Sequence, residues 1–328
     1  MKKLSWLLLA IVAAIFGAYV AENGGLKGFK LPGGLTLPGL GGGGTTSGPI
    51  PARVTDTIRV ATWNIQVFGE SKLQDPTAMN VIVSVLRNFD VIAIQEVRAV
   101  SQEVVPELVA QLNADGQHHY DYVLGPRLGR TTSKEQYVFI FEMATIEVDR
   151  NQLYTVDDSK FDLLHREPLV GWFRARGAPP EQAFTFTLVN VHTDPDEVDR
   201  ELDALADVYV SVQGDARQED DTIMLGDFNA NDKNLRRLGQ IAGLRRLVVN
   251  APTNTLQTAM YDNVLFLEHA TPEFTGRGGV FDFWREFNLT EKQATDVSDH
   301  LPLWAEFSVY EGGRAGPVAT RGETFPTQ

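Results

Sequence analysis

The sequence predicts an α/β domain, on three observations. Short apolar runs bounded by turn residues alternate with longer segments whose apolar side chains recur at helical spacing. Polar side chains directly follow several of the apolar runs, which is typical of the ligand-binding edge of an α/β sheet. The chain has 328 residues, of which 43% are hydrophobic and 22% charged, an ordinary composition for one large globular domain or two modest ones.

The expected elements follow one another from residue 51 to residue 310. Short apolar runs predict strands, and an apolar stripe with a period near 3.6 residues predicts helices. The expected strands lie at 58–63, 91–94, 137–141, 184–191, 222–225, 263–266 and 304–307. The expected helices lie at 75–89, 104–112 and 198–212, and the stripe on the last of these indicates core packing.

The ends of the chain have a different character. Lys2 and Lys3 precede an apolar run over 4–21 that would extend about 27 Å as a helix. Residues 1–21 are therefore expected to be a cleaved signal peptide or an uncleaved signal anchor, and both options predict export. Eleven of the 29 residues in 22–50 are glycine, which predicts a flexible linker, and 311–328 is expected to be a loose tail.

Composition excludes several function classes. The chain has no cysteine, so a disulfide framework, a thiolate metal site and a cysteine nucleophile are excluded. The formal net charge is −14, which excludes a broadly basic protein that coats nucleic acid. A phosphate substrate remains compatible with this charge if cations or a local basic patch intervene.

The chemistry-bearing residues stand at the ends of the predicted strands. Carboxylate and amide oxygens are hard ligands suited to Mg²⁺, Ca²⁺ or Mn²⁺, and two histidines beside carboxylates suit proton transfer near neutral pH. Their convergence at one sheet edge would place both chemistries in one site. The residues are Asn64, Glu96, His192, Asp227 and Asn229 at strand ends, with Asp299 and His300 before the last strand.

Six short motifs in order make the pattern specific. They are Trp-Asn-Ile-Gln at 63–66, Gln-Glu-Val-Arg at 95–98, Asn-Val-His at 190–192, Gly-Asp-Phe-Asn-Ala at 226–230, Tyr-Asp-Asn at 261–263 and Ser-Asp-His at 298–300. This series resembles the endonuclease/exonuclease/phosphatase superfamily and, within it, the deoxyribonuclease I branch. The resemblance covers about three quarters of the chain. It implies a four-layer α/β sandwich of two packed, mixed β-sheets flanked by helices.

The resemblance also implies roles for individual residues. Glu96 is the expected metal ligand, with Asn64 and Asp299 as neighbours, and the expected cation is Mg²⁺, with Ca²⁺ or Mn²⁺ as alternatives. His192 and His300 form the expected acid/base pair. Each histidine has a carboxylate partner in the family pattern, and the remaining positions either orient the water and the scissile phosphate or hold a second metal. These residues are Glu135 for His192, Asp262 for His300, and Asp227 and Asn229 for the positioning role.

Three arginines are expected to contact substrate phosphate. Arg98 and Arg166 correspond to phosphate-contacting positions in the family, and Arg130 is a further candidate. A guanidinium group matches the geometry of a phosphate. The other histidines match no motif and are expected to be structural or on the surface; they are His118, His119, His165 and His269.

The implied function is a metal-dependent phosphodiesterase, specifically a monomeric endonuclease that hydrolyses DNA and is secreted or tethered to a membrane. Three positions depart from the family pattern: Gln66 and Asn263 replace arginines, and Ser133 replaces a tyrosine. Other substrates therefore stay open, namely RNA, a sphingomyelin-like lipid or an inositol phosphate. A non-catalytic binding module is the alternative from a different class, and it predicts eroded site residues.

Overall fold

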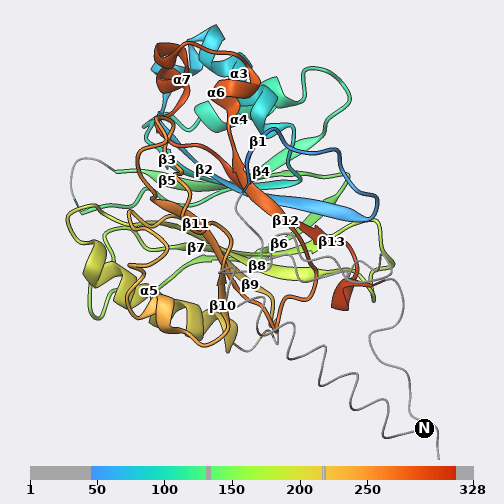
Figure 1. Ribbon diagram of the computed structural model, residues 1–328, viewed down its shortest axis with the longest axis vertical. Helices are drawn as coiled ribbons and strands as arrows, with labels where there is room; N and C mark the ends of the chain where they lie inside the picture. Colours follow the sequence, from blue (N-terminus) through green and yellow to red (C-terminus); the bar gives the residue numbers. More distant parts are fainter. Residues whose placement is uncertain (1–45, 131–133, 216, 218, 315–328) are drawn as a thin grey trace, which may run out of the picture. The chain divides into compact units, whose positions relative to one another are not determined.

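The computed structural model describes residues 46–130, 134–215, 217 and 219–314 (Figure 1). The expected signal peptide or anchor, most of the expected linker and most of the expected tail lie outside the described residues. Within the described ranges, no helix has the length and apolarity needed to span a membrane.

Two mixed β-sheets form the centre of the domain. The seven-stranded sheet has the order β1 (Thr46–Gly48), β12 (Phe274–Phe281), β13 (Leu303–Ser308), β2 (Thr57–Phe68), β3 (Val91–Val97), β5 (Gln136–Glu142) and β4 (Tyr120–Leu124). The six-stranded sheet has the order β10 (Leu244–Arg246), β11 (Asp262–Leu267), β9 (Thr222–Asp227), β8 (Thr185–His192), β7 (Leu169–Ala175) and β6 (Ile146–Thr155). Each sheet contains one central parallel pair, β2 with β3 and β8 with β9.

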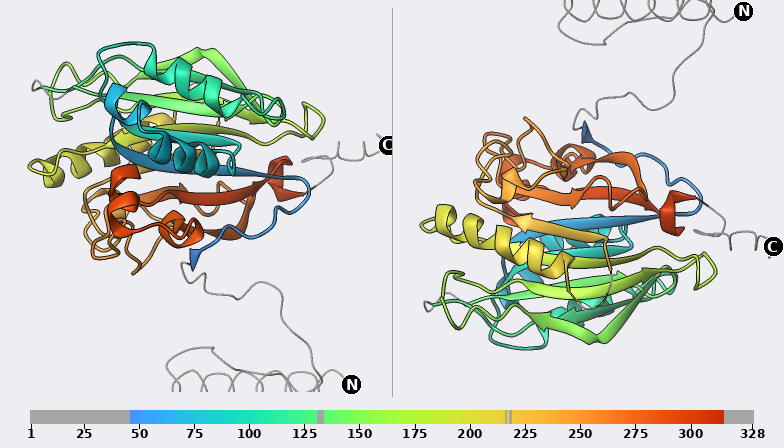
Figure 2. Two further views of the ribbon diagram at one scale, coloured as in Figure 1. Left: turned by 90° about the horizontal axis from the view of Figure 1, so that it is seen from above. Right: turned by 90° about the horizontal axis from the view of Figure 1, so that it is seen from below.

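Helices cover the outer face of each sheet (Figures 1 and 2). The seven-stranded sheet carries α2 (Glu70–Leu73), α3 (Pro76–Leu86), α4 (Val104–Leu112), α6 (Phe283–Glu286) and α7 (Glu291–Val297). The six-stranded sheet carries α5 (Val198–Gln213), and two short 3-10 helices, η1 (Leu238–Gln240) and η2 (Glu311–Gly313), lie in connections. The predicted four-layer sandwich is therefore confirmed.

Local sequence explains the two longest helices. Asp75 caps α3 by accepting hydrogen bonds from the backbone N–H groups of Thr77 and Ala78, and Pro76 follows at the first helical position. In α5, the buried face contains Leu202, Leu205 and Tyr209, as the apolar stripe predicts.

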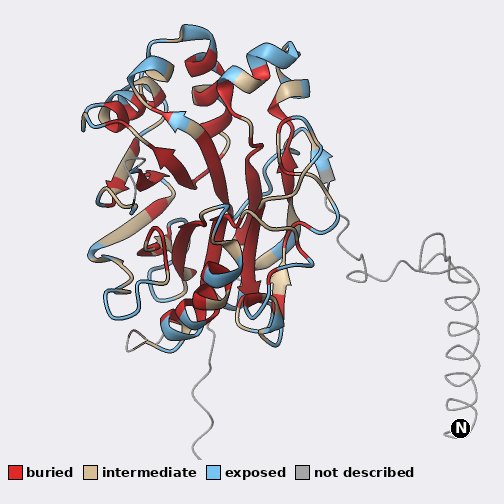
Figure 3. Ribbon diagram, turned by 90° about the vertical axis from the view of Figure 1, so that its left-hand side faces the viewer, coloured by how far each residue is buried: buried red, intermediate tan, exposed pale blue. Residues whose placement is uncertain are grey.

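Aromatic side chains fill the space between the sheets. Phe307 of β13 lies 5.7 Å from Phe184 and 5.8 Å from Phe266 of β11, measured between ring centroids. Figure 3 shows that buried residues follow the strands, whereas the outer sides of the helices are exposed. The two sheets therefore share one apolar core that holds their edges in a fixed relation.

The domain extends beyond the expected boundaries at both ends. β1 falls inside the range expected to be linker, yet it pairs in parallel with β12, with Thr46 opposite Gly279. Glu311 begins η2, inside the range expected to be tail, and accepts a hydrogen bond from the backbone N–H of Thr185. Both segments are too short and too polar to stand out as elements in the sequence.

Candidate active site

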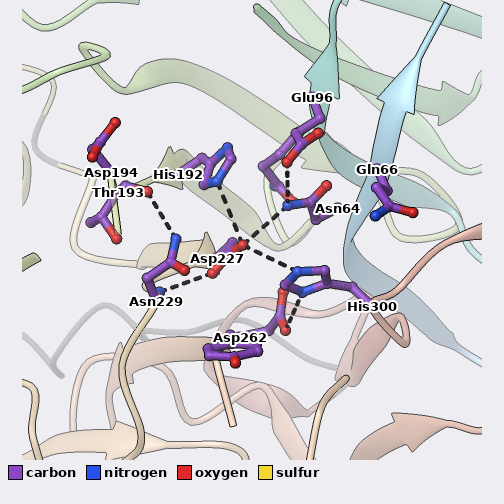
Figure 4. A network of polar contacts seen from close by, with 12 residues as sticks. Asn64, Gln66, Glu96, His192, Thr193, Asp194, Asp227, Asn229, Asp262 and His300 are labelled. Atoms are coloured by element: carbon purple, nitrogen blue, oxygen red, sulfur yellow. Dashed lines mark hydrogen bonds and ion pairs between the residues drawn. The ribbon is translucent and has the colours of Figure 1, made fainter. Parts of the chain in front are cut away.

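The site lies where the parallel pairs of both sheets end (Figure 4). In β8 and β9, His192 stands opposite Asp227 as the last register pair. In the other sheet, Asn64 of β2 stands opposite Gln95 of β3, one residue before Glu96. Because the carboxyl ends of parallel strands meet at one edge, these side chains converge as the sequence predicts.

Gly226 allows β9 to approach β8 closely enough for this convergence. Its φ of +145° is rare for residues with a side chain, and a Cβ at this position would lie 2.0 Å from the carbonyl oxygen of Val191. A glycine is therefore required immediately before Asp227, and the tight contact sets the position of Asp227 beside His192.

His192 is held by a buried carboxylate. Its Nδ1 lies 2.7 Å from Oε1 of Glu135, and the same oxygen lies 3.2 Å from Nε of Arg166. Burial opposes ionisation of both partners, but their mutual attraction raises the pKa of His192 and lowers the pKa of Glu135. The contact through Nδ1 leaves the Nε2 atom of His192 directed toward Asp227.

His300 forms a second pair of the same kind. Its Nδ1 lies 2.9 Å from Oδ2 of Asp262, which also accepts a hydrogen bond from the hydroxyl of Thr253 at 2.7 Å. Burial favours the neutral ring, but the carboxylates of Asp262 and Asp227 overcome it and raise the pKa of His300 to about 10. The two carboxylates therefore favour the imidazolium form of His300.

Asp227 lies between the two imidazoles. Its Oδ2 is 3.6 Å from Nε2 of His192, 3.5 Å from Nε2 of His300 and 3.0 Å from Nδ2 of Asn64. Burial favours the protonated acid, yet the two rings hold the pKa of Asp227 below its ordinary value. Asn229 donates its backbone N–H to Oδ1 of Asp227 and its side-chain amide to the carbonyl of Thr193.

Glu96 is fixed beside Asn64 by an unusual backbone geometry. Its φ of +62° lies in the left-handed region, and its Oε2 accepts the backbone N–H of Val67 at 2.8 Å. Its Oε1 accepts from Nδ2 of Asn64 at 3.3 Å, and Nε of Arg98 lies 3.2 Å from Oε2. Strain of this type is concentrated at functional sites, where the surrounding fold maintains it.

The oxygens around Glu96 fit a divalent cation. Oδ1 of Asn64 and Oδ1 of Asp299 are buried, and no described residue donates a hydrogen bond to either atom. The other oxygen of Asp299 accepts from Nε2 of Gln66 at 2.9 Å, so the side chain is held in place. Carboxylate and amide oxygens without donors suit a hard cation such as Mg²⁺.

The predicted arginines are placed differently from one another. Arg98 and Arg166 line a cavity of about 390 Å³ with the imidazoles, and Arg166 donates to the carbonyls of His192 and Thr193. Arg130 does not line this cavity; it is ion-paired with Glu197 at 2.6 Å and with Asp162 at 3.1 Å. Arg130 is therefore engaged by two acids and does not join Arg98 and Arg166 in the lining of this cavity.

Sequence reasoning gave no site role to four residues that line the cavity, namely His165, Asp194, Pro195 and Tyr261. His165, expected to be structural or on the surface, lies beside Arg166 with its Nδ1 3.4 Å from Oδ2 of Asp194. The available signal for His165 was its position directly before Arg166, an expected phosphate-contacting residue.

It also missed residues that hold the site from behind. Ser298 donates to the carbonyl of Asn64 at 2.7 Å, the indole of Trp63 donates to the carbonyl of His300 at 2.8 Å, and the hydroxyl of Tyr137 accepts from the backbone N–H of His192 at 2.9 Å. Ser298 and Trp63 stand within the quoted motifs, next to the residues they support.

Comparisons with known proteins agree with this geometry. The Endonuclease/Exonuclease/phosphatase family model matches residues 61–288. Deoxyribonuclease gamma of Rattus norvegicus is 34% identical, covering 75% of this chain and 83% of the relative, and deoxyribonuclease-1 of Sus scrofa is 32% identical, covering 75% and 90%.

Solved structures show the same fold at low identity. The human nocturnin catalytic domain has a TM-score of 0.51 at 16% identity, covering 78% of this chain and 96% of that chain. Humanized D. rerio TDP2 has a TM-score of 0.54 at 14% identity, covering 77% and 100%. From the family model and the curated relatives together, the chain belongs to the endonuclease/exonuclease/phosphatase family, in the branch of the deoxyribonuclease I-like proteins.

Proposed function

We propose that this phosphodiester hydrolase is a divalent-cation-dependent endonuclease that cuts DNA. The observation that carries the proposal is the meeting of two histidine–carboxylate pairs at Asp227, with Nε2 distances of 3.6 and 3.5 Å. The names of its relatives, deoxyribonuclease gamma and deoxyribonuclease-1, support DNA as the substrate. The intact site argues against a non-catalytic binding module.

The two imidazoles supply the proton transfers. Each Nδ1 is held by a carboxylate, so each ring offers its Nε2 to the cavity. Hydrolysis of a phosphodiester requires one group that takes a proton from the attacking water and one that donates a proton to the leaving oxygen. Two rings at one phosphate provide both groups, and Glu135 and Asp262 stabilise the imidazolium forms.

Charge on the phosphate has to be neutralised in the same cavity. Glu96, Asn64 and Asp299 would hold the cation, Mg²⁺ or alternatively Ca²⁺ or Mn²⁺. A cation there supplies positive charge for the nonbridging oxygens in the transition state. Arg98 and Arg166 line the cavity and offer guanidinium groups to the same phosphate. Asn229, fixed by its hydrogen bonds to Asp227 and Thr193, orients the phosphate or the water.

The location of the enzyme is part of the proposal. The apolar run at 4–21 behind Lys2 and Lys3 supports export, with the catalytic domain secreted or anchored to the membrane outside the cytoplasm. We further propose that the enzyme acts as a monomer, because the residues assigned a role converge on one cavity within a single domain.

Two departures from the family pattern bear on the form of the nucleic acid. Asn263 exchanges hydrogen bonds with the backbone of Val248 at 2.9 and 3.1 Å, and Gln66 donates to Asp299. Neither side chain offers a positive charge to a DNA strand. Single-stranded DNA and RNA therefore belong in the substrate test beside duplex DNA.

The test compares substrates and variants in one assay. The substrates are plasmid, single-stranded DNA, RNA and sphingomyelin, each with Mg²⁺, Ca²⁺, Mn²⁺ or excess chelator. His192→Ala and His300→Ala should each lower the rate of DNA cleavage by roughly 10²- to 10⁴-fold. The exposed residue His269 provides the matched control, and His269→Ala should cleave at the parent rate. Parent-level cleavage by both site variants, or cleavage that survives chelation, would refute the mechanism.

A further inference from the structure

A second group of carboxylates lies at the opposite end of β9 from Asp227. Asp221 directly precedes β9, Glu273 directly precedes β12, and Glu311 begins η2. Each residue contributes one carboxylate oxygen to a set of three atoms that all lie within 4.8 Å of one another. Asp221 and Asp227 are six positions apart along an extended strand, so this group is about 20 Å from the active site.

Burial makes this group costly without a positive partner. Asp221 is 0% exposed and Glu273 is 1% exposed. No N–H group of the described residues donates to either oxygen of Asp221 or to Oε2 of Glu273, and Asp221 interacts with the hydroxyl of Thr271. No basic nitrogen in the described ranges lies within 4.0 Å of any of the three carboxylates. Unpaired charges buried together are strongly unfavourable, so either protons or a cation must neutralise them.

Backbone and indole N–H groups donate to one oxygen of Glu273, one oxygen of Glu311 and both oxygens of the neighbouring Glu219. Oε1 of Glu273 accepts from the N–H of Gly312 at 2.5 Å, and Oε2 of Glu311 accepts from the N–H of Thr185 at 3.2 Å. Glu219, which neighbours Asp221, accepts from the backbone N–H of Asp221 and from the indole of Trp172, both at 3.0 Å. The carboxylates are therefore held in place, while both oxygens of Asp221 and Oε2 of Glu273 have no N–H donor among the described residues.

A neutral hydroxyl also lies beside the acids. The hydroxyl of Thr271 interacts with the carboxylate of Asp221, and the residue is 2% exposed. Thr271 therefore adds a buried neutral oxygen to the group of three carboxylates.

We propose that Asp221, Glu273 and Glu311 bind a Ca²⁺ ion, with Thr271 available as a neutral oxygen ligand. All donors are oxygens, which suits a hard cation, and the irregular set taken from three segments suits the flexible coordination of Ca²⁺ better than the strict octahedron of Mg²⁺. Glu311 is partly exposed, which gives the ion a path from solvent. Without a cation, burial and the neighbouring Glu273 raise the pKa of Asp221 to about 10, so protons would compete for the site.

The ion would join the two sheets. Asp221 belongs to the six-stranded sheet through β9, whereas Glu273 and Glu311 flank β12 and β13 of the seven-stranded sheet. A ligand that binds only the folded protein stabilises it by mass action. Ca²⁺ should therefore raise the melting temperature through contacts remote from the reaction.

The test measures melting temperature and Ca²⁺ stoichiometry in chelator-treated protein. Ca²⁺ at 1 mM should raise the melting temperature of the parent by several degrees. Asp221→Asn and the partly exposed Glu311→Gln should each lose most of this increase and one bound Ca²⁺ by calorimetry. Glu107→Gln on the exposed side of α4 is the matched control, and it should keep the full rise in melting temperature and the bound Ca²⁺. A cation bound at Glu96 should raise the melting temperature equally in the parent and the three variants, so it does not affect the comparison.

Two results would overturn the proposal. If the group is neutralised by shared protons alone, Ca²⁺ will not shift the parent and Asp221→Asn will melt higher without any cation. An equal shift in the parent and both site variants would place the Ca²⁺ elsewhere. If Asp221→Asn does not fold, Glu311→Gln gives the same comparison. Neither readout involves cleavage, so the result is independent of the proposed nuclease activity.

Discussion

At the scale of single residues, the site is a chain of alternating charges. It runs from Glu135 through His192, Asp227 and His300 to Asp262, and each link is 2.7 to 3.6 Å long. Each acid stabilises the protonated form of its neighbouring ring, and the rings stabilise the ionised acids. Removing any member therefore changes the protonation of the others as well as its own contacts.

Glu135→Gln tests this coupling at the first link. Loss of the carboxylate should lower the pKa of His192 toward its ordinary value. His300 keeps its own partner Asp262, so the pKa of His300 should stay raised. Titration of the two ring resonances by NMR in the presence of chelator measures both values, so His300 is the internal control. An unchanged His192 pKa would show that Glu135 does not set its protonation.

The same variant predicts a pH dependence of stability. The pKa of His192 is raised above its unfolded value near 6.5. The stability that the protonated ring contributes to the folded protein is therefore complete below about pH 6.5 and is lost as pH rises through the folded pKa. Glu135→Gln should lower the free energy of unfolding by about 3–5 kcal/mol near pH 6, because it leaves Arg166 and an imidazolium buried without their acid. Urea denaturation across pH should show the difference between parent and variant shrinking at alkaline pH; a constant difference would contradict the coupling.

At the scale of elements, the close packing of β8 against β9 sets the site. Gly226→Ala would place a methyl group 2.0 Å from the carbonyl oxygen of Val191, so the strands must separate. We expect a loss of about 2–4 kcal/mol in unfolding free energy and a large loss of cleavage.

Gly276→Ala is the control for the backbone contribution in that experiment. Gly276 has a φ of +82° but nothing within 4 Å of the added Cβ, so it should cost only about 1 kcal/mol and leave cleavage intact. Equal losses at the two glycines, measured by denaturation, would show that strand contact is not what matters at Gly226.

The elements also show what the sequence can and cannot predict. The apolar runs predicted β3, β5, β8, β9 and β13 because both faces of these strands are buried. β6 is mostly half-exposed and polar, and β12 contains Gly276, Gly278 and Gly279, so neither has a periodic apolar pattern. The left-handed backbone of Glu96 and the ion pairs of Arg130 depend on tertiary contacts between distant segments, which no local pattern records.

At the scale of the whole molecule, an acidic protein has to attract an acidic polymer. The net charge of −14 opposes the approach of DNA, and two arginines line the cavity. Neutralisation of about two phosphates predicts that a change from 50 to 200 mM salt weakens substrate binding roughly tenfold.

Arg98→Gln tests the source of that salt dependence. It should reduce the logarithmic salt slope of KM by about one, because one phosphate contact is lost. Arg236→Gln is the control, since Arg236 is paired with Asp199 and Asp203 away from the cavity. A salt slope that is flat in the parent, or equal in parent and Arg98→Gln, would contradict this assignment.

The hydrogen bond from Trp63 to the carbonyl of His300 joins the first and last segments of the site, and it bears on how the protein is made. Synthesis proceeds from Asn64 toward His300, so a nascent chain that ends before residue 300 contains His192 but not His300, and the place of β13 between β12 and β2 is unfilled. Such a nascent polypeptide has no competent nuclease centre. We therefore expect the reaction centre to be completed only when translation of the domain is nearly finished.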